Sequence, residues 1–352
     1  MNVLFIGGTG LISTATVRQL IAAGHTVTCF NRGKSESRLP GGSYEVILGD
    51  RKDYAAFENT FADKRFDVVV DMVAFSPDDT ASAIRAFSGR CGQFLHCSTV
   101  CVYSGPPTLI PTPETEPFHS VGGYGKNKIK CEELLFAAHE ANGFPATILR
   151  PSHSYGEGGQ VIRSWGKHDT FIDRLRKNKP VVVQGDGSSL WASCHVDDVG
   201  RGFIATMGVA ACKGQAYNIT ADEYFTWNTY FAICAAAAGG VFDPCYIPTD
   251  ILADRAPGLS GGLTEIFTHT SIFDNAKIKR DTASGDAPYT GQAVGFAAGV
   301  ARNIAWLDES GKIGDSDASE SDQYEDELIA AWRPGVRNAL PSAETPRRMR
   351  TA

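Results

Sequence analysis

No stretch of this 352-residue chain is apolar for long enough to cross a bilayer, and the chain carries no excess of basic residues. It has 33 lysines and arginines against 40 aspartates and glutamates, which gives a net charge of −7. A membrane-spanning helix needs about 20 consecutive apolar residues, and nucleic-acid binding relies on clustered positive charge. We therefore expect neither a membrane protein nor a general nucleic-acid-binding protein.

The sequence also has no internal repeat and no cysteine spacing typical of a metal site. Cys97 and Cys101 lie four residues apart, but no second Cys/His pair at metal-ligand spacing accompanies them, so no metal site is predicted. The chain begins directly with a strand-like segment, so we expect no signal peptide. Nine irregularly spaced cysteines are then expected to be reduced thiols, as in a cytoplasmic protein.

What is present begins with a glycine-rich turn near the N-terminus. Residues 3–6 form a short apolar run of the buried-strand kind, and a helical pattern extends from the turn to Ala23. Glycines let the backbone approach a pyrophosphate, and a helix N-terminus supplies N–H donors and partial positive charge. The turn predicts a dinucleotide-binding site, in which Ser13 replaces the third glycine of the usual fingerprint. The cofactor-binding residues predicted here are Gly7, Gly10, Leu11 and Ile12.

The residues after the second predicted strand, 26–30, bear on which dinucleotide is bound. The usual acid for the adenosine ribose is replaced by Asn31, followed by Arg32 and Lys34. An asparagine can bond a ribose hydroxyl, whereas Arg32 could pair with a 2′-phosphate or be a solvated turn residue. Asp50 follows a third apolar run and could meet the adenine edge or cap its own loop. NAD is favoured, and NADP stays open.

Strand-like and helical patterns alternate through the first half of the chain. Further apolar runs at 44–48, 66–70 and 92–95 read as strands, with a helix over 79–87. Such alternation predicts an α/β fold, a Rossmann doubly wound parallel sheet that binds its ligand at the carboxyl ends of the strands. A smaller substrate-binding lobe is expected after it.

Tyr124 and Lys128 lie four residues apart at the start of a strongly helical run that ends near Gly143. This spacing stacks the two side chains on one face of a helix. A free phenol titrates near pH 10, and a nearby ammonium favours the phenolate. The pair can therefore exchange a proton with a substrate hydroxyl while a hydride is transferred at the same carbon.

Several motifs, in this order, resemble those of the extended short-chain dehydrogenases/reductases of the NAD-dependent epimerase/dehydratase kind. The resemblance runs from residue 1 to about 203 and continues more weakly towards 305. The motifs are Gly7-Gly8-Thr9-Gly10-Leu11-Ile12, Ser98-Thr99-Val100-Cys101-Val102-Tyr103, Tyr124-x-x-x-Lys128, Leu149-Arg150-Pro151-Ser152-His153-Ser154-Tyr155-Gly156, Gly185-Asp186-Gly187 and His195-Val196-Asp197-Asp198-Val199.

The resemblance implies roles for individual residues. Thr99 would bond the substrate oxygen, with Ser98 beside it. Tyr124 would be the acid/base, and Lys128 would bond the nicotinamide ribose and lower the tyrosine pKa. NAD would be held tightly, take a hydride from a sugar hydroxyl carbon to give a ketone, and return it later. The ketone permits epimerisation or loss of water.

Two departures from the family pattern bear on the substrate. The sugar-nucleotide 4,6-dehydratases carry an Asp-Glu pair where this chain has Val100-Cys101. Nucleotide-sugar enzymes usually carry an arginine for the diphosphate where this chain has Trp191, four residues before His195. A tryptophan offers a stacking surface for a sugar or a nucleobase, or packs in the core. His153 is a further substrate-contact candidate, although loop histidines such as His153 and His195 are often structural.

We therefore expect an NAD-dependent sugar-modifying enzyme of the epimerase/dehydratase type, acting on a nucleoside or a sugar that lacks a diphosphate. The alternatives are a nucleotide-sugar 4-epimerase, an NADP-dependent reductase, and a non-catalytic RNA-binding relative. The expected partner is a small-molecule sugar or nucleoside substrate, with no nucleic acid and no membrane, and a homodimer is compatible with the sequence.

Three regions are predicted along the chain. Residues 1–149 form the NAD(P)-binding Rossmann domain, and residues 150–305 form the substrate-binding lobe with interleaved Rossmann elements. Residues 306–352 form an extension that is acidic and then basic, with a short amphipathic piece at 324–332. We expect its acidic and basic parts to be solvated surface or a loose tail.

Overall fold

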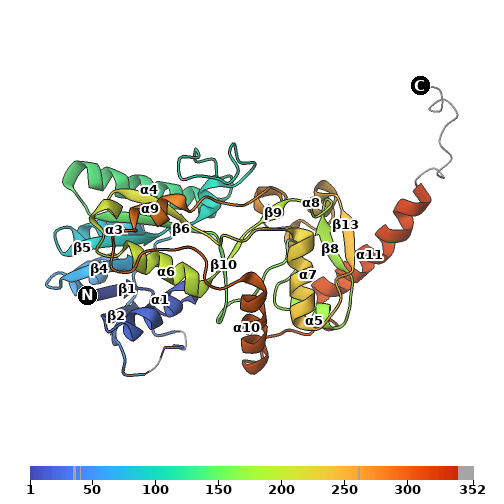
Figure 1. Cartoon of the computed structure of the whole chain (residues 1–352), viewed down its shortest axis with the longest axis horizontal. Helices are drawn as coiled ribbons and strands as arrows, with labels where there is room; N and C mark the ends of the chain where they lie inside the picture. Colours follow the sequence, from blue (N-terminus) through green and yellow to red (C-terminus); the bar gives the residue numbers. More distant parts are fainter. Residues whose placement is uncertain (35–36, 40, 261, 340–352) are drawn as a thin grey trace.

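Parallel strands form the central sheet of the larger of two lobes (Figure 1). The computed structural model describes residues 1–34, 37–39, 41–260 and 262–339. The neighbours in the sheet are, in order, β11 (Gln215–Ile219), β6 (Ala146–Pro151), β5 (Cys91–Cys97), β4 (Phe66–Asp71), β1 (Asn2–Ile6), β2 (Thr26–Asn31) and β3 (Glu45–Leu48). Strand order therefore reverses at β1, and the predicted doubly wound Rossmann-type sheet is confirmed.

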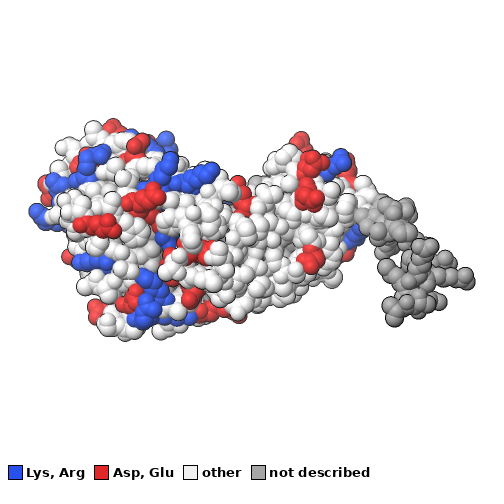
Figure 2. Space-filling view, turned by 90° about the horizontal axis from the view of Figure 1, so that it is seen from above, with Lys and Arg blue, Asp and Glu red and all other residues white. Residues whose placement is uncertain are grey.

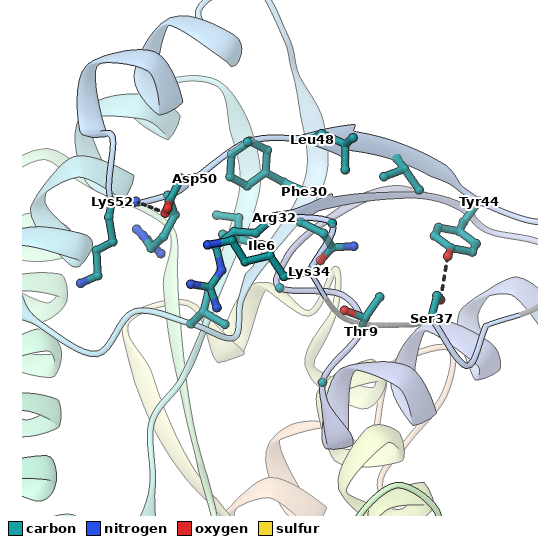
Figure 3. Close-up of a pocket in the computed structure, with 18 of the residues that line it drawn as sticks. Ile6, Thr9, Phe30, Arg32, Lys34, Ser37, Tyr44, Leu48, Asp50 and Lys52 are labelled. Atoms are coloured by element: carbon teal, nitrogen blue, oxygen red, sulfur yellow. Dashed lines mark hydrogen bonds between the residues drawn. The ribbon is translucent and has the colours of Figure 1, made fainter.

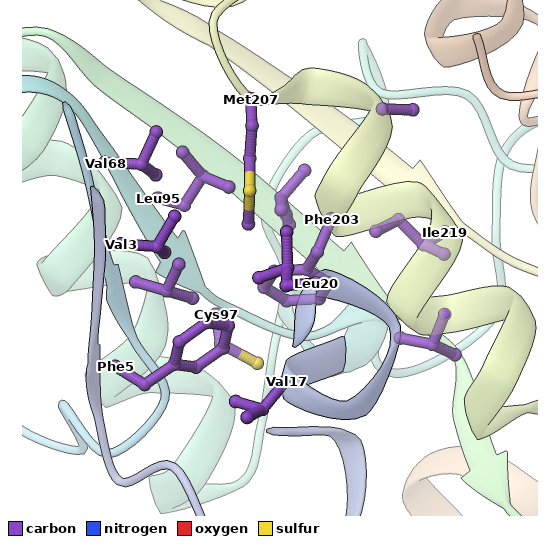
Figure 4. Packing of buried hydrophobic residues seen from close by; sticks show 14 of the residues in the cluster. Val3, Phe5, Val17, Leu20, Val68, Leu95, Cys97, Phe203, Met207 and Ile219 are labelled. Atoms are coloured by element: carbon purple, nitrogen blue, oxygen red, sulfur yellow. The ribbon is translucent and has the colours of Figure 1, made fainter. Parts of the chain in front are cut away.

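Helices cover both faces of this sheet, because its strands are apolar on both sides. One face packs against α1 and α6, and the core between them is drawn in Figure 4 with Phe5, Leu20 and Phe203 among its buried side chains. The other face packs against α2, α3 and α4 through Phe57, Phe87 and other aromatic rings. The helices of this lobe are α1 (Leu11–Ala22), α2 (Tyr54–Thr60), α3 (Pro77–Phe87), α4 (Gly123–Asn142), α6 (Val196–Thr206) and α9 (Ala276–Asp281).

The smaller lobe is built from short strand pairs around aromatic side chains (Figure 1). Its strands pair as β7 (His153–Tyr155) with β10 (Ser193–His195), β9 (Leu190–Trp191) with β12 (Phe225–Thr226), and β8 (Val181–Gln184) with β13 (Pro244–Ile247). Its helices are α5 (Phe171–Arg176), α7 (Trp227–Ala238), α8 (Thr249–Arg255), α10 (Phe296–Glu309) and α11 (Glu320–Ala339). Short turns complete the chain at η1 (Val100–Tyr103), η2 (Ala210–Cys212), η3 (Pro257–Leu259) and η4 (Leu263–Phe267).

The chain crosses between the lobes more than once. β11, far along the sequence, returns to pair with β6 in the central sheet. This return is the interleaving expected for residues 150–305, while the three domain boundaries stay a prediction. None of the described helices is both long enough and apolar enough to span a membrane.

The acidic segment 308–320 is mostly exposed, as predicted, whereas the rest of helix α11 is held against the smaller lobe by buried charges. Asp322 and Glu325 of α11 are 1% exposed and pair with two equally buried guanidinium groups, those of Arg163 and Arg174. Charged side chains are almost never fully buried without partners, so these pairs hold α11 against the lobe. The basic segment 342–352 lies outside the described residues.

Candidate active site

A cavity of about 500 Å³ lies at the carboxyl ends of the first three strands (Figure 3). Its walls include the glycine turn after β1, the segment that follows β2 and the loop that follows β3. This is the position where open α/β sheets bind ligands. The predicted cofactor residues that line it are Gly7, Gly10, Asn31, Arg32 and Asp50.

The glycine turn has the geometry that a dinucleotide requires. Gly7 has a φ of 86°, and a Cβ there would lie 2.5 Å from a methyl carbon of Val73. A Cβ on Gly8 would lie 2.3 Å from the sulfur of Cys29. Gly10 then caps α1 without a side chain, which leaves the helix N-terminus open towards the cavity. The residues present therefore fit a dinucleotide, and the predicted Leu11 and Ile12 form the first turn of α1.

Asn31 and Asp50 each have a structural partner beside the cavity. The side-chain oxygen of Asn31 accepts a hydrogen bond from the Gly8 N–H at 2.9 Å, which ties the end of β2 to the glycine turn. The Asp50 carboxylate accepts the Lys52 N–H at 2.9 Å. Loop capping, the structural alternative for Asp50, is therefore observed, and Asp50 still lines the cavity.

Arg32 and Lys34 are two positively charged side chains at this cavity without an ion pair among the described residues. Both are exposed, and both line the cavity. By contrast, Arg51 pairs with the buried Asp71 at 2.6 Å, and Lys52 pairs with Asp79 at 2.7 Å. Figure 3 shows Arg32 and Lys34 beside the end of β2, so either could meet a phosphate on the adenosine ribose.

Replacement of Arg32 by alanine tests this reading. If Arg32 pairs with a 2′-phosphate, Arg32→Ala weakens NADP binding about ten- to a hundredfold, because a hydrogen bond to a charged group is lost. NAD binding then changes far less. Titration of both nucleotides against the wild type, Arg32→Ala and the neighbouring Lys34→Ala measures this. Equal losses for NAD and NADP in Arg32→Ala would leave Arg32 as a turn residue only.

Tyr124 and Lys128 lie on one face of α4, as their spacing predicts. The Lys128 side chain is buried, and its ammonium donates to the carbonyls of Ala74, in the loop after β4, at 2.8 Å and of Cys97, the last residue of β5, at 2.6 Å. It lies 5.9 Å from the centre of the Tyr124 ring and 5.0 Å from that of Phe75. Phe75 lines the first cavity, so the pair stands beside its inner end.

The predicted lowering of the Tyr124 pKa by Lys128 is not found in the chain alone. Tyr124 as a whole is 49% exposed, but desolvation around its hydroxyl raises its pKa, and a hydrogen bond with the Thr99 side chain opposes the shift only in part. The physical reason is that the Lys128 ammonium is bound to two carbonyl groups rather than to the phenol oxygen. At neutral pH the phenol is therefore protonated and available as a proton donor.

Thr99 and Ser98 have different surroundings, although they are adjacent. Thr99 lines a second cavity of about 250 Å³, and its hydroxyl oxygen accepts the Cys101 N–H at 3.1 Å. Ser98 lines neither cavity, and its hydroxyl donates to the buried carboxylate of Glu132, which also pairs with Arg150. The predicted substrate contact of Ser98 is therefore not supported, because its hydroxyl is already used inside the protein.

Aromatic rings form one wall of the second cavity. Trp191 is only 5% exposed and stacks on Trp227 with ring centres 4.9 Å apart. Its N–H donates to the Ser193 hydroxyl, and Phe267 packs edge-on at 5.3 Å. Trp191 thus packs in the core of the smaller lobe and also lines the cavity, and its contact with a substrate stays a prediction.

The two loop histidines differ in role. His153 lines the second cavity, bonds the Ser193 hydroxyl at 2.9 Å, and has its pKa lowered to about 3, mainly by burial. It is therefore a neutral hydrogen-bonding group. His195 is buried and caps α6 by accepting the Asp197 N–H, which is a structural role.

Some cavity residues carry no sequence signal. Glu265 and Phe267 lie on η4, in a stretch without helical or strand periodicity, and Phe75 lies in the loop after β4. Trp227 looks like an ordinary core residue of a helix. Only the packing of distant segments brings these side chains to the two cavities.

Comparison with known proteins agrees with this arrangement. The model of the NAD dependent epimerase/dehydratase family matches residues 3–88 and 80–220, which is more than half of the chain. A crystal structure of UDP-glucose 4-epimerase with UDP-glucose from Thermotoga maritima superposes with a TM-score of 0.71 at 21% identity. It covers 88% of this chain and 99% of that one, which shows the shared fold.

Two related proteins have names that indicate functions other than epimerisation. The 2′-dehydrokanamycin reductase of Streptomyces kanamyceticus is 25% identical over 338 residues, which cover 96% of this chain and 93% of that protein. The chloroplast stem-loop binding protein of 41 kDa b of Arabidopsis thaliana is 28% identical over 251 residues. These cover 68% of this chain and 63% of that protein.

Proposed function

The chain belongs to the NAD dependent epimerase/dehydratase family, and we propose that it acts on a nucleoside or a sugar that carries no diphosphate. The observation that carries this proposal is the lining of the second cavity. Among the described residues, that lining includes neither a lysine nor an arginine. A diphosphate in such a cavity would have no charge-assisted partner.

Arg150, which belongs to one of the family motifs, does not supply a positive charge to the second cavity. Arg150 is 2% exposed; its Nε and one Nη donate to the Glu132 carboxylate, and its other Nη donates to the hydroxyl of Tyr103, which lines the cavity. Freeing it would leave Glu132 as an unpaired buried carboxylate, which is costly. What the cavity does offer is an aromatic wall, the Thr99 hydroxyl and a neutral imidazole, a set suited to a polyhydroxylated ring.

As a member of this family the chain is an NAD-dependent enzyme, and the cofactor supplies the acceptor and donor of a hydride at a hydroxyl-bearing carbon. We assign the proton transfer to Tyr124, which lines neither cavity itself but neighbours Phe75 of the first and bonds Thr99 of the second. We assign the substrate oxygen to Thr99. Lys128 is expected to contact the cofactor ribose. Epimerisation or loss of water would follow from the ketone.

A second candidate is a reductase that releases its cofactor after each turnover. The relative that matches nearly the whole chain is named as a reductase. Desolvation around the Tyr124 hydroxyl raises its pKa, which keeps the phenol in the proton-donating form that ketone reduction needs. The exposed Arg32 would suit NADP.

A nucleic-acid-binding function is not extended to this chain from its stem-loop binding relative. On the face shown in Figure 2, lysine and arginine side chains are mixed with acidic ones. The chain as a whole has a net charge of −7. Binding to a nucleic acid relies on clustered basic side chains.

A thermal-shift screen in the presence of NAD tests the proposed substrate class. UDP-, GDP- and dTDP-sugars are compared with nucleosides and unphosphorylated sugars, and we expect stabilisation only by ligands without a diphosphate. A ligand present at a hundred times its Kd stabilises by about 2.7 kcal/mol, which is readily measured. Strong stabilisation by one sugar nucleotide, with none by uncharged ligands, would contradict the proposal and favour the alternative function of a nucleotide-sugar 4-epimerase.

A further inference from the structure

Glu265 lies on an unusual turn at the rim of the second cavity. Leu263–Phe267 is a π-helix that follows Gly262, whose φ is 79°. Its backbone is fixed at two points: the Glu265 carbonyl accepts the Gly105 N–H at 2.8 Å, and the Phe267 carbonyl accepts the Trp227 N–H at 3.0 Å. Single π-turns occur frequently at functional sites. The turn therefore presents Glu265 from a rigid support.

The Glu265 carboxylate lies close to the start of α4, where Tyr124 stands. A Cβ on Gly122, the residue that caps α4, would be 2.6 Å from one carboxylate oxygen of Glu265. Glu265 is half-buried and lines the same cavity as Thr99. An acidic group is thus held near the two residues assigned to proton transfer and substrate binding.

This carboxylate has no charge partner in its surroundings. Among the described residues it accepts no hydrogen bond and forms no ion pair, and it is the one formally charged side chain in the cavity lining. A neighbouring cavity of about 490 Å³ shares Pro107 and Thr270 with the second cavity and has Asp186 as its charged lining residue. Both spaces therefore carry negative charge without a lysine or an arginine in their described linings.

We propose that Glu265 binds a protonated amine of the substrate, so that the second cavity selects amino sugars or amino nucleosides. A half-buried carboxylate without a protein partner can accept charge-assisted hydrogen bonds from an ammonium group that enters the cavity. The same carboxylate repels a diphosphate. This inference rests on the proposed function, because it takes the second cavity as the substrate site.

Matched ligands that differ only in the amine test the proposal. Binding of glucosamine, N-acetylglucosamine and glucose, and of 3′-amino-3′-deoxyadenosine and adenosine, is measured calorimetrically on the full chain with NAD. In the wild type we expect each amine to bind at least about tenfold more tightly than its uncharged partners, the scale of a charged hydrogen bond. In Glu265→Gln that preference disappears, whereas in the control Glu133→Gln, an exposed carboxylate on α4, it is retained.

The outcomes separate Glu265 from the rest of the proposed function. A preference for amines that survives in Glu265→Gln, equal binding of amines and alcohols by the wild type, or no binding of any amine overturns the proposal. A Glu265→Gln variant that only turns over more slowly, with unchanged ligand preference, makes Glu265 a proton-transfer group and likewise overturns it. Amine binding measured in Tyr124→Phe, which lacks the assigned proton-transfer group, tests the role of Glu265 without depending on catalysis. Binding of a UDP-sugar would instead contradict the proposed function, which holds that the substrate carries no diphosphate.

Discussion

Tyr124→Phe is expected to lose at least about a hundredfold in turnover, the usual scale of general acid/base catalysis. The substitution keeps the ring, which lies 6.4 Å from that of Phe75 and 5.9 Å from the Lys128 ammonium. It removes only the hydroxyl to which we assign proton exchange with a substrate oxygen bound at Thr99. Because the ring contacts remain, NAD affinity and folding should change little, and the loss should appear in kcat.

The measurement is steady-state turnover of the substrate identified in the ligand screen, with NAD binding determined separately. Tyr246→Phe serves as a matched control, because Tyr246 is 43% exposed on β13 and lines neither cavity. Turnover of Tyr124→Phe equal to the wild type would refute the assignment of Tyr124 as the acid/base.

Glu325→Ala is expected to lower the free energy of unfolding by about 3–5 kcal/mol, the cost of removing one partner of a buried ion pair. Glu325 pairs with Arg163 and Arg174 and accepts the Val182 N–H at 2.9 Å. After the substitution, two buried guanidinium groups share the remaining buried carboxylate of Asp322. The N–H of Val182, on β8, loses its acceptor.

Urea unfolding followed by circular dichroism measures this loss. Glu327→Ala on the same helix is the control, because Glu327 is exposed, and a surface change of this kind stays within about 0.5 kcal/mol. An equally small effect in Glu325→Ala would mean that α11 is not held by its buried charges.

The sequence by itself determined the cofactor-binding half of this protein. The glycine turn, the alternation of strands and helices, and the Tyr124 and Lys128 pair are local patterns, with periods set by the backbone. Their positions along the chain agree with β1, α1 and α4 of the structure. The parallel, doubly wound character of the sheet followed from the same alternation, because parallel strands need crossover helices, whereas the strand order came from the structure.

The tertiary structure decided which side chains face the substrate. Ser98 and Thr99 are neighbours in the chain, yet one bonds Glu132 and the other lines the cavity. The acidic segment 308–320 is mostly exposed, as its composition predicts, but two buried arginines from elsewhere bind the buried carboxylates of α11 that follow it. Glu265 comes to lie beside the start of α4 through a turn without periodicity. Contacts between side chains that are distant in the sequence depend on how whole helices and strands pack, so a local sequence pattern does not predict them.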